Sequence, residues 1–93
     1  MKMKLKPGYL VQKIAGENIL IAGGTGNVDL SNMLVLNDSA TMIIQTLIDR
    51  EVSMEDLIEV LVVNYNVDAE HVEEDVKELL IELNKQNVLE QTV

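Results

Sequence analysis

Residues 33–44 read MLVLNDSATMII, and the change of pattern inside this stretch decides the fold. Its first four residues, Met33–Leu36, are apolar and suit a short strand. The apolar residues that follow recur at the helical spacing of three and four positions, at Ala40, Ile43, Ile44, Leu47 and Ile48. Asn37, Asp38 and Ser39 stand between the two patterns. A side-chain oxygen of Asn37 or Asp38 is expected to accept a hydrogen bond from a free amide at the helix start, so the polar cluster predicts a cap.

Two further amphipathic helices are expected after the first. The second follows Ser53-Met-Glu-Asp56, which has the spacing of a capping box with Asp in place of the usual Glu or Gln. Its apolar stripe is Met54, Leu57, Ile58, Leu61 and Tyr65. Asp68 is the expected N-cap of the third helix, and Asn87 is expected to end it in the left-handed conformation. The apolar stripe of this third helix is Val72, Val76, Leu79, Leu80 and Leu83.

The residues before Met33 have the alternation of β-strands. We expect strands over 9–15 and 18–22, joined by a type II′ turn with Gly16 at its first central position. Val28–Leu30 forms another short segment, which the turn dipeptide Ser31-Asn32 separates from Met33–Leu36. The predicted fold class is α+β, with a small antiparallel β-meander of about three or four strands before three helices, in the layout of a winged helix-turn-helix.

Length and composition fit a single domain over residues 1–93. Of the 93 residues 47% are apolar and none is cysteine, so the core is aliphatic and has neither disulfides nor thiolate zinc sites. The basic start, with Lys2, Lys4 and Lys6, is expected to be loosely ordered over residues 1–8. Apolar runs of the length of a signal peptide or a membrane span are absent from the sequence, so a cytoplasmic protein without membrane contact is expected.

Residue types that enzymes use are sparse. Cysteine is absent, and the serines lie at expected turns or caps without a histidine nearby in the sequence. His71, Glu74 and Asp75 share one side of a helix, which is weak evidence of a metal site. Asp75 borders the third apolar stripe, where a structural hydrogen bond is its expected role. Since the glycines of residues 23–27, GGTGN, also lack phosphate-loop spacing, we expect neither catalysis nor a cofactor or metal.

Other binding functions stay open at this point. The winged-helix layout suggests a DNA-associated regulator, but a net charge of −9 and few basic residues on the second and third helices disfavour nucleic acid. Surplus apolar residues outside the helix stripes suggest a partner surface or a structural homodimer, or helices that are buried on two sides. These surplus residues are Val60, Val62, Val63 and Ile81.

Five short motifs stand in a characteristic order along the chain. They are Leu36-Asn37, Ser39-Ala40, Ser53-Met-Glu-Asp-Leu57, Tyr65-Asn-Val-Asp68 and Asp75-Val-Lys-Glu-Leu-Leu-Ile-Glu-Leu83. With the short β-meander before them, they resemble the coenzyme PQQ synthesis protein D (PqqD) family over residues 7–90. The resemblance implies a RiPP recognition element. Such non-catalytic domains capture the leader of a ribosomally made precursor peptide for a modifying enzyme, often a radical SAM protein.

In domains of this kind the leader adds as a strand to the edge of the small sheet and leans on the third helix. Carried onto this chain, the resemblance implies an edge strand at Met33–Leu36. Because side chains alternate along a strand, Met33 and Val35 are the freer contacts if Leu34 and Leu36 point into the core. The implied groove wall consists of residues that also fit the core, namely Val72, Val76, Leu79 and Leu83.

Overall fold

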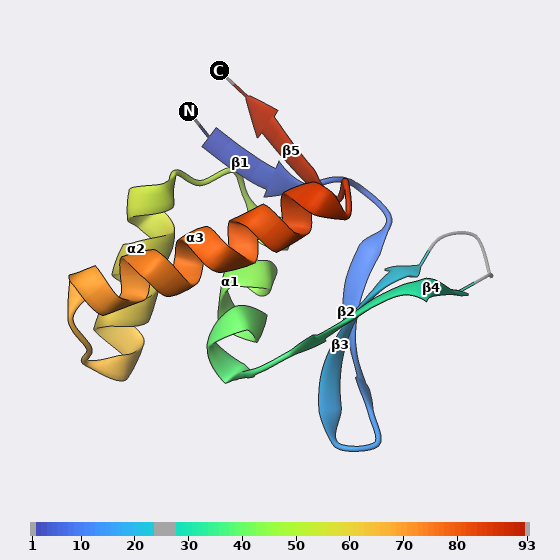
Figure 1. The fold of residues 1–93 in the computed structure, drawn as a ribbon. Coiled ribbons are helices and arrows are strands. Elements are labelled where there is room, and N and C mark those ends of the chain that lie inside the picture. Colours follow the sequence, from blue (N-terminus) through green and yellow to red (C-terminus); the bar gives the residue numbers. More distant parts are fainter. Residues whose placement is uncertain (1, 24–27, 93) are drawn as a thin grey trace.

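A computed structural model describes residues 2–23 and 28–92 of the chain. Within these ranges, four strands precede three helices and a fifth strand follows them (Figure 1). The elements are β1 Lys2–Leu5, β2 Tyr9–Ile14, β3 Glu17–Gly23, β4 Val28–Leu36, α1 Asp38–Asp49, α2 Met54–Tyr65, α3 Ala69–Lys85 and β5 Leu89–Thr92. All strand pairs are antiparallel, which confirms the predicted α+β class, and the winged helix-turn-helix layout fits loosely. None of the described helices has the length and apolarity that crossing a bilayer requires.

The hairpin of β2 and β3 is confirmed, but its turn differs from the predicted one. Ile14 pairs with Glu17, so the central residues are Ala15 and Gly16, with φ of 53° and 82°. Positive φ at both central positions identifies a type I′ turn and not the predicted type II′ turn. Types I′ and II′ both match the right-handed twist of the strands. The observed register puts Gly16 at the second central position and not at the first, where a type II′ turn favours Gly, and Ala15 takes the left-handed region.

Strand β4 runs unbroken through the turn predicted at Ser31-Asn32, so that prediction is wrong. The pairing with β3 nevertheless shifts near this point, since Leu20 faces Leu34 while Ala22 faces Asp29. The extra residues of β4 form an irregularity of the β-bulge kind, which bends a strand without ending it. Of the predicted glycine-rich turn GGTGN, residues 24–27 lie outside the described residues.

The loose order expected for residues 1–8 is wrong for Lys2–Leu5, which form a strand paired with β5 in a second, two-stranded sheet. Met3 and Leu5 are buried in the core, while Lys2 is exposed and Lys4 is half-buried. Two backbone hydrogen bonds, of 2.7 and 2.8 Å, also join Met3 to Val52. The alternation of basic and apolar residues is therefore that of a half-buried strand.

Asn87 directs the chain from α3 back to β1. Its φ is 59°, as predicted. The N–H of Val88 donates to the carbonyl of Leu83 at 3.2 Å, and the N–H of Asn87 donates to the carbonyl of Asn84 at 3.1 Å. These are the two hydrogen bonds of a Schellman motif, in which a left-handed residue closes the helix. The turn leads directly into β5, a strand that the sequence analysis missed.

The capping box predicted for α2 is present. The N–H of Asp56 donates to Ser53 Oγ at 3.2 Å, and the N–H of Ser53 donates to Asp56 Oδ2 at 3.0 Å. These hydrogen bonds, that of the Ser53 backbone first, lower the pKa of Asp56 below its ordinary value of 3.8. Asp68 occupies the N-cap position of α3 as predicted, but its side chain makes no capping hydrogen bond.

The core lies where the helices meet the small sheet of β1 and β5 and one face of the larger sheet (Figure 1). Each helix contributes residues from its predicted stripe, which are Ile43, Ile44, Leu47, Leu57, Leu61, Val72, Val76 and Leu83. Ile48 and Tyr65 were predicted in the stripes but are exposed. Among the surplus apolar residues Val62 packs against the core and Val60 is half-buried, whereas Val63 and Ile81 are exposed.

Candidate functional site

Strand β4 lies at the edge of the three-stranded sheet, whose order is β2-β3-β4. Among the described strands, β4 is therefore paired on one side only, with β3. Along an edge strand, alternate residues direct their backbone N–H and C=O groups outward without a partner strand. The free edge of β4 is thus able to pair with another extended chain.

The side chains of Met33–Leu36 alternate between two surroundings. Leu36 is buried, and Leu34 packs against the core. Met33 and Val35, on the other face of the sheet, are 41% and 57% exposed. This is the alternation expected from the sequence, and it leaves β4 with one face anchored and one face accessible.

Asn37 fixes the passage from β4 into α1. Its Oδ1 accepts hydrogen bonds from the N–H of Ala40 at 2.8 Å and from Ser39 Oγ at 3.0 Å. Its backbone carbonyl accepts from the N–H and the Oγ1 of Thr41, at 2.9 and 2.8 Å. The predicted cap is confirmed, with Asn37 as the capping residue. Because both its side chain and its backbone are bonded, the end of β4 is held firmly against the start of α1.

A cleft opens between the end of β4, the start of α1 and the middle of α3. This part of it, called here the β4 section, has a volume of about 350 Å³. Its apolar lining is Leu34, Val35, Leu36, Ala40, Ile43, Leu61 and Leu79. A cleft that combines apolar and polar lining beside an unpaired strand edge offers both side-chain burial and backbone hydrogen bonds to an extended ligand.

The cleft continues toward the end of α2. This second part, called here the α2 section, has a volume of about 420 Å³. Asn37, Ser39, Leu61 and Asp75 line both sections, so the two lie next to each other. The α2 section adds the side chains of Asp38, Tyr65, Val67 and Val72. Tyr65 and Val67 are among the exposed large apolar residues, which makes this section the more open part of an apolar surface.

The site residues expected from the sequence divide into three groups. Leu34, Val35 and Leu79 line the β4 section and Val72 lines the α2 section. Met33 is exposed on β4 and lines neither section. Val76 and Leu83 are 0% exposed, so the structure places them in the core and not on the cleft wall. Val76 and Leu83 belong to the core cluster against which the cleft residue Leu79 packs.

Several residues that line the cleft were missed by the sequence analysis. They are Asn37, Ser39, Ala40, Ile43, Leu61, Asp75, Glu78 and Glu82. The last three share a helix face with Leu79, because positions three, four and seven apart lie together on a helix. This spacing could have indicated the cleft-facing side of α3 from the sequence. Two residues of the predicted groove wall, Val76 and Leu83, instead lie on the neighbouring side of the helix, in the core.

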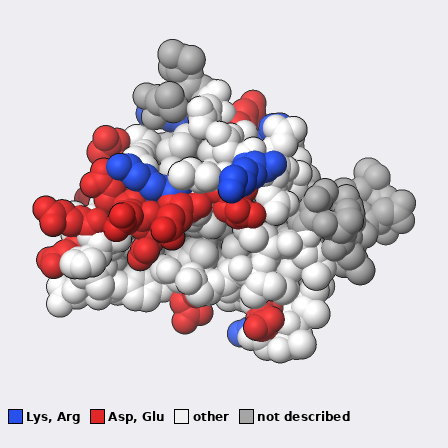
Figure 2. All heavy atoms as spheres, viewed as in Figure 1, with Lys and Arg blue, Asp and Glu red and all other residues white. Residues whose placement is uncertain are grey.

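Asp75, Glu78 and Glu82 form an acidic lip along the α3 side of the cleft. Figure 2 shows acidic side chains gathered along the course of α3. Among the described residues that line either section, none is Lys or Arg. The side chains of Asp75 and Glu78 have no hydrogen bond or ion pair with another described residue, so the structural hydrogen bond expected for Asp75 is not found there. The lip is negatively charged and faces solvent.

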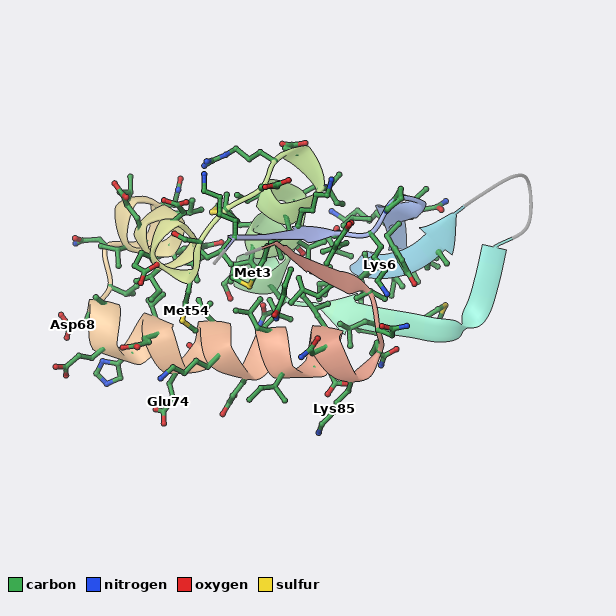
Figure 3. All side chains as sticks on the ribbon, turned by 90° about the horizontal axis from the view of Figure 1, so that it is seen from above. Met3, Lys6, Met54, Asp68, Glu74 and Lys85 are labelled. Carbon is green, nitrogen blue, oxygen red and sulfur yellow. The ribbon has the colours of Figure 1, made fainter. Side chains whose placement is uncertain are left out.

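The remaining chemical candidates do not converge on this cleft. His71 is exposed, with its Nδ1 3.9 Å from a carboxylate oxygen of Asp68 and not grouped with Glu74 and Asp75. Across residues 2–23 and 28–92, no group of three or more His, Asp or Glu side chains is placed to hold a metal ion. Lys77 lines a separate hollow on another side of α3, and Lys85 points away from the body of the molecule (Figure 3).

The fold and the cleft define a class of protein: a small α+β domain whose edge strand borders a partly apolar groove beside a helix, as in domains that bind extended peptides. Residues 17–89 match the family model of Coenzyme PQQ synthesis protein D (PqqD). The chain belongs to this family, as the motif resemblance implied.

Two solved structures are similar over almost the whole chain. One is "Lasso peptide synthetase B1 complexed with the leader peptide", with 25% identity, a TM-score of 0.69 and coverage of 98% of this chain and 100% of that chain. The other is "TbiB1 in Complex with the TbiA(beta) Leader Peptide", with 22% identity, a TM-score of 0.70 and coverage of 97% and 98%. The comparison with curated proteins gives no match.

Proposed function

We propose that this chain is a non-catalytic RiPP recognition element, a single cytoplasmic domain that binds the leader of a ribosomally made precursor peptide and presents it to a modifying enzyme. The observation that carries the proposal is the position of the free edge of β4 beside a partly apolar cleft walled by α3. Membership of the PqqD family supports it. So does the similarity to a lasso peptide synthetase B1 solved with a leader peptide.

Binding by strand addition follows from the two faces of β4. A leader strand paired with β4 alternates its side chains in the same way as β4 does. Those beside Leu34 and Leu36 enter the β4 section of the cleft, while those beside Met33 lie on the exposed face of the sheet. The backbone hydrogen bonds supply affinity for any extended chain, and the cleft supplies preference for particular side chains.

The partner that we infer from the family is a radical SAM enzyme. Presentation requires a second surface that stays free while the cleft is occupied. Val63 on α2 and Ile81 on α3 are exposed and line neither section of the cleft, so both remain accessible beside a bound leader. Exposed aliphatic residues of this kind are common at contacts between proteins.

The test is a titration of the isotope-labelled chain with a synthetic leader of the precursor peptide encoded beside its gene, followed by amide NMR signals. We expect the largest shifts at Met33–Leu36 and at residues 75–82 of α3. Leu79→Ala is expected to weaken binding by about five- to tenfold, since it removes an apolar contact in the cleft. Ile81→Ala is the matched control on the same helix and is expected to bind like the unaltered chain. Shifts confined to other regions, or equal losses in both variants, contradict the proposal.

A further inference from the structure

The proposed peptide site combines the apolar lining residues of the β4 section, called here the floor, with the acidic lip of Asp75, Glu78 and Glu82. Leu79 contributes to the floor and lies between the lip residues on the same helix face. Asp75 and Glu78 are exposed and Glu82 is half-buried, with its Oε1 accepting a hydrogen bond from Gln86 Nε2 at 3.3 Å. A ligand strand that buries a side chain beside Leu79 therefore has carboxylates on both sides of it.

Other carboxylates of α3 are arranged differently. Glu73 forms an ion pair with Lys77 at 3.5 Å, and Glu74 points away from the body of the molecule (Figure 3). Neither of them lines the cleft. The lip carboxylates face the place where a ligand lies, and none of them has an ion pair with a described residue. An uncharged or acidic ligand leaves this charge unbalanced, whereas a basic ligand compensates it.

The spacing of the lip matches an extended strand. With a helical rise of about 1.5 Å per residue, Asp75 and Glu82 are about 10 Å apart along α3. Residues on one face of a strand are about 6.7 Å apart, so the two neighbours of a central residue on that face are about 13 Å apart. Lys and Arg have long flexible side chains with apolar stems, which lie along an apolar surface and carry the charge to its edge. The flexibility of Lys and Arg side chains covers the difference between the spacing of about 10 Å along α3 and the spacing of about 13 Å along the strand.

We infer that the peptide recognised by this cleft carries an apolar residue that enters the β4 section opposite Leu79, with Lys or Arg two positions before it and two positions after it. The basic residues pair with the two ends of the acidic lip. This inference rests on the proposed function, because it assumes strand addition at β4. It adds a sequence rule for the ligand, in which the lip selects charge and the floor selects apolar character.

The probe is a displayed library of random dodecapeptides, selected on the full chain. We expect enrichment of peptides with the basic, apolar, basic pattern at alternate positions. The triple variant Asp75→Asn, Glu78→Gln, Glu82→Gln is expected to bind these peptides about tenfold more weakly at low salt, given about 1.5- to fivefold for each partly exposed ion pair. The difference is expected to shrink as salt screens the charges. The triple variant Glu70→Gln, Glu73→Gln, Glu74→Gln removes equal charge outside the cleft and is expected to bind like the unaltered chain.

A second test removes the charge from the peptide and leaves the chain unaltered. Selected peptides with Lys and Arg replaced by Gln are expected to bind more weakly, and this result does not depend on the folding of the lip variant. Amide NMR signals then separate two failures. Peptides that shift Met33–Leu36 but show no basic preference, and bind the lip variant equally well, overturn the charge rule and leave the proposed function standing. Selected peptides that leave Met33–Leu36 unshifted overturn both.

Discussion

Small polar residues at the ends of elements set much of the local geometry. The sequence assigned Ser53 to a cap and Asn87 to a left-handed helix end, as the structure shows. It offered Asn37 or Asp38 as the first cap, and the structure selects Asn37. Such roles depend on groups within about four residues, so they can be predicted from local sequence. Asp68 marks the limit of this reasoning, because it has the right position without the capping hydrogen bond.

Asp56 couples the stability of α2 to pH. Its folded-state pKa is lowered, first by the hydrogen bond from the Ser53 backbone, so the folded chain favours the carboxylate. The resulting stabilisation is present above the unfolded-state pKa and is lost as pH falls through the folded-state value. In urea unfolding from about pH 5 down to about pH 2, the stability advantage of the unaltered chain over Asp56→Asn is expected to shrink. Glu55→Gln removes a charge from the same helical turn without a capping bond and serves as control. An advantage that stays constant across this range contradicts the assignment.

At the level of elements, the sequence predicted best where the pattern is regular. The three helices follow from their apolar stripes, and the β2–β3 hairpin follows from alternation around Gly16. The prediction erred on the turn type and on the break in β4, because both depend on how strands twist and pair. A turn dipeptide such as Ser31-Asn32 can sit within a bulged strand when the neighbouring strand supplies its pairing.

The β2–β3 turn offers a direct test of its I′ geometry. Ala15 adopts φ of 53°, which costs an L-residue with a Cβ about 1 kcal/mol and costs Asn less. Ala15→Asn is therefore expected to raise the free energy of unfolding by about 0.5 to 1 kcal/mol in urea denaturation. Gly16→Ala is the opposing change. A Cβ at Gly16 meets no atom within 4 Å, so its expected loss of about 1 kcal/mol comes from the backbone conformation, with φ of 82°. A destabilised Ala15→Asn variant contradicts a type I′ turn.

At the level of the whole molecule, the features missed by the sequence analysis are those formed by distant segments. The β1–β5 sheet joins the two ends of the described chain, and neither strand has a local partner that could reveal it. The cleft likewise needs β4, α1 and α3 together. The stripe of α3 indicated which residues are apolar, but only the packing shows that Leu79 faces the cleft while Val76 lies beneath it. The spacing of Asp75, Glu78 and Glu82 indicated a shared helix face, but only the packing shows that this face borders the cleft.

The pairing of the two ends is expected to contribute strongly to stability, and a double-mutant cycle tests it. Leu5 of β1 and Leu89 of β5 face each other in the sheet register, and both are buried in the core cluster. Each change to Ala is expected to lower the free energy of unfolding by about 2 to 4 kcal/mol, and the pair is expected to couple by about 0.5 kcal/mol or more. Lys4 and Glu90 are register partners on the other face of the same sheet, and their changes to Ala are expected to cost about 0.5 kcal/mol or less. If Leu5→Ala costs no more than Lys4→Ala, β1 is not part of the cooperative fold.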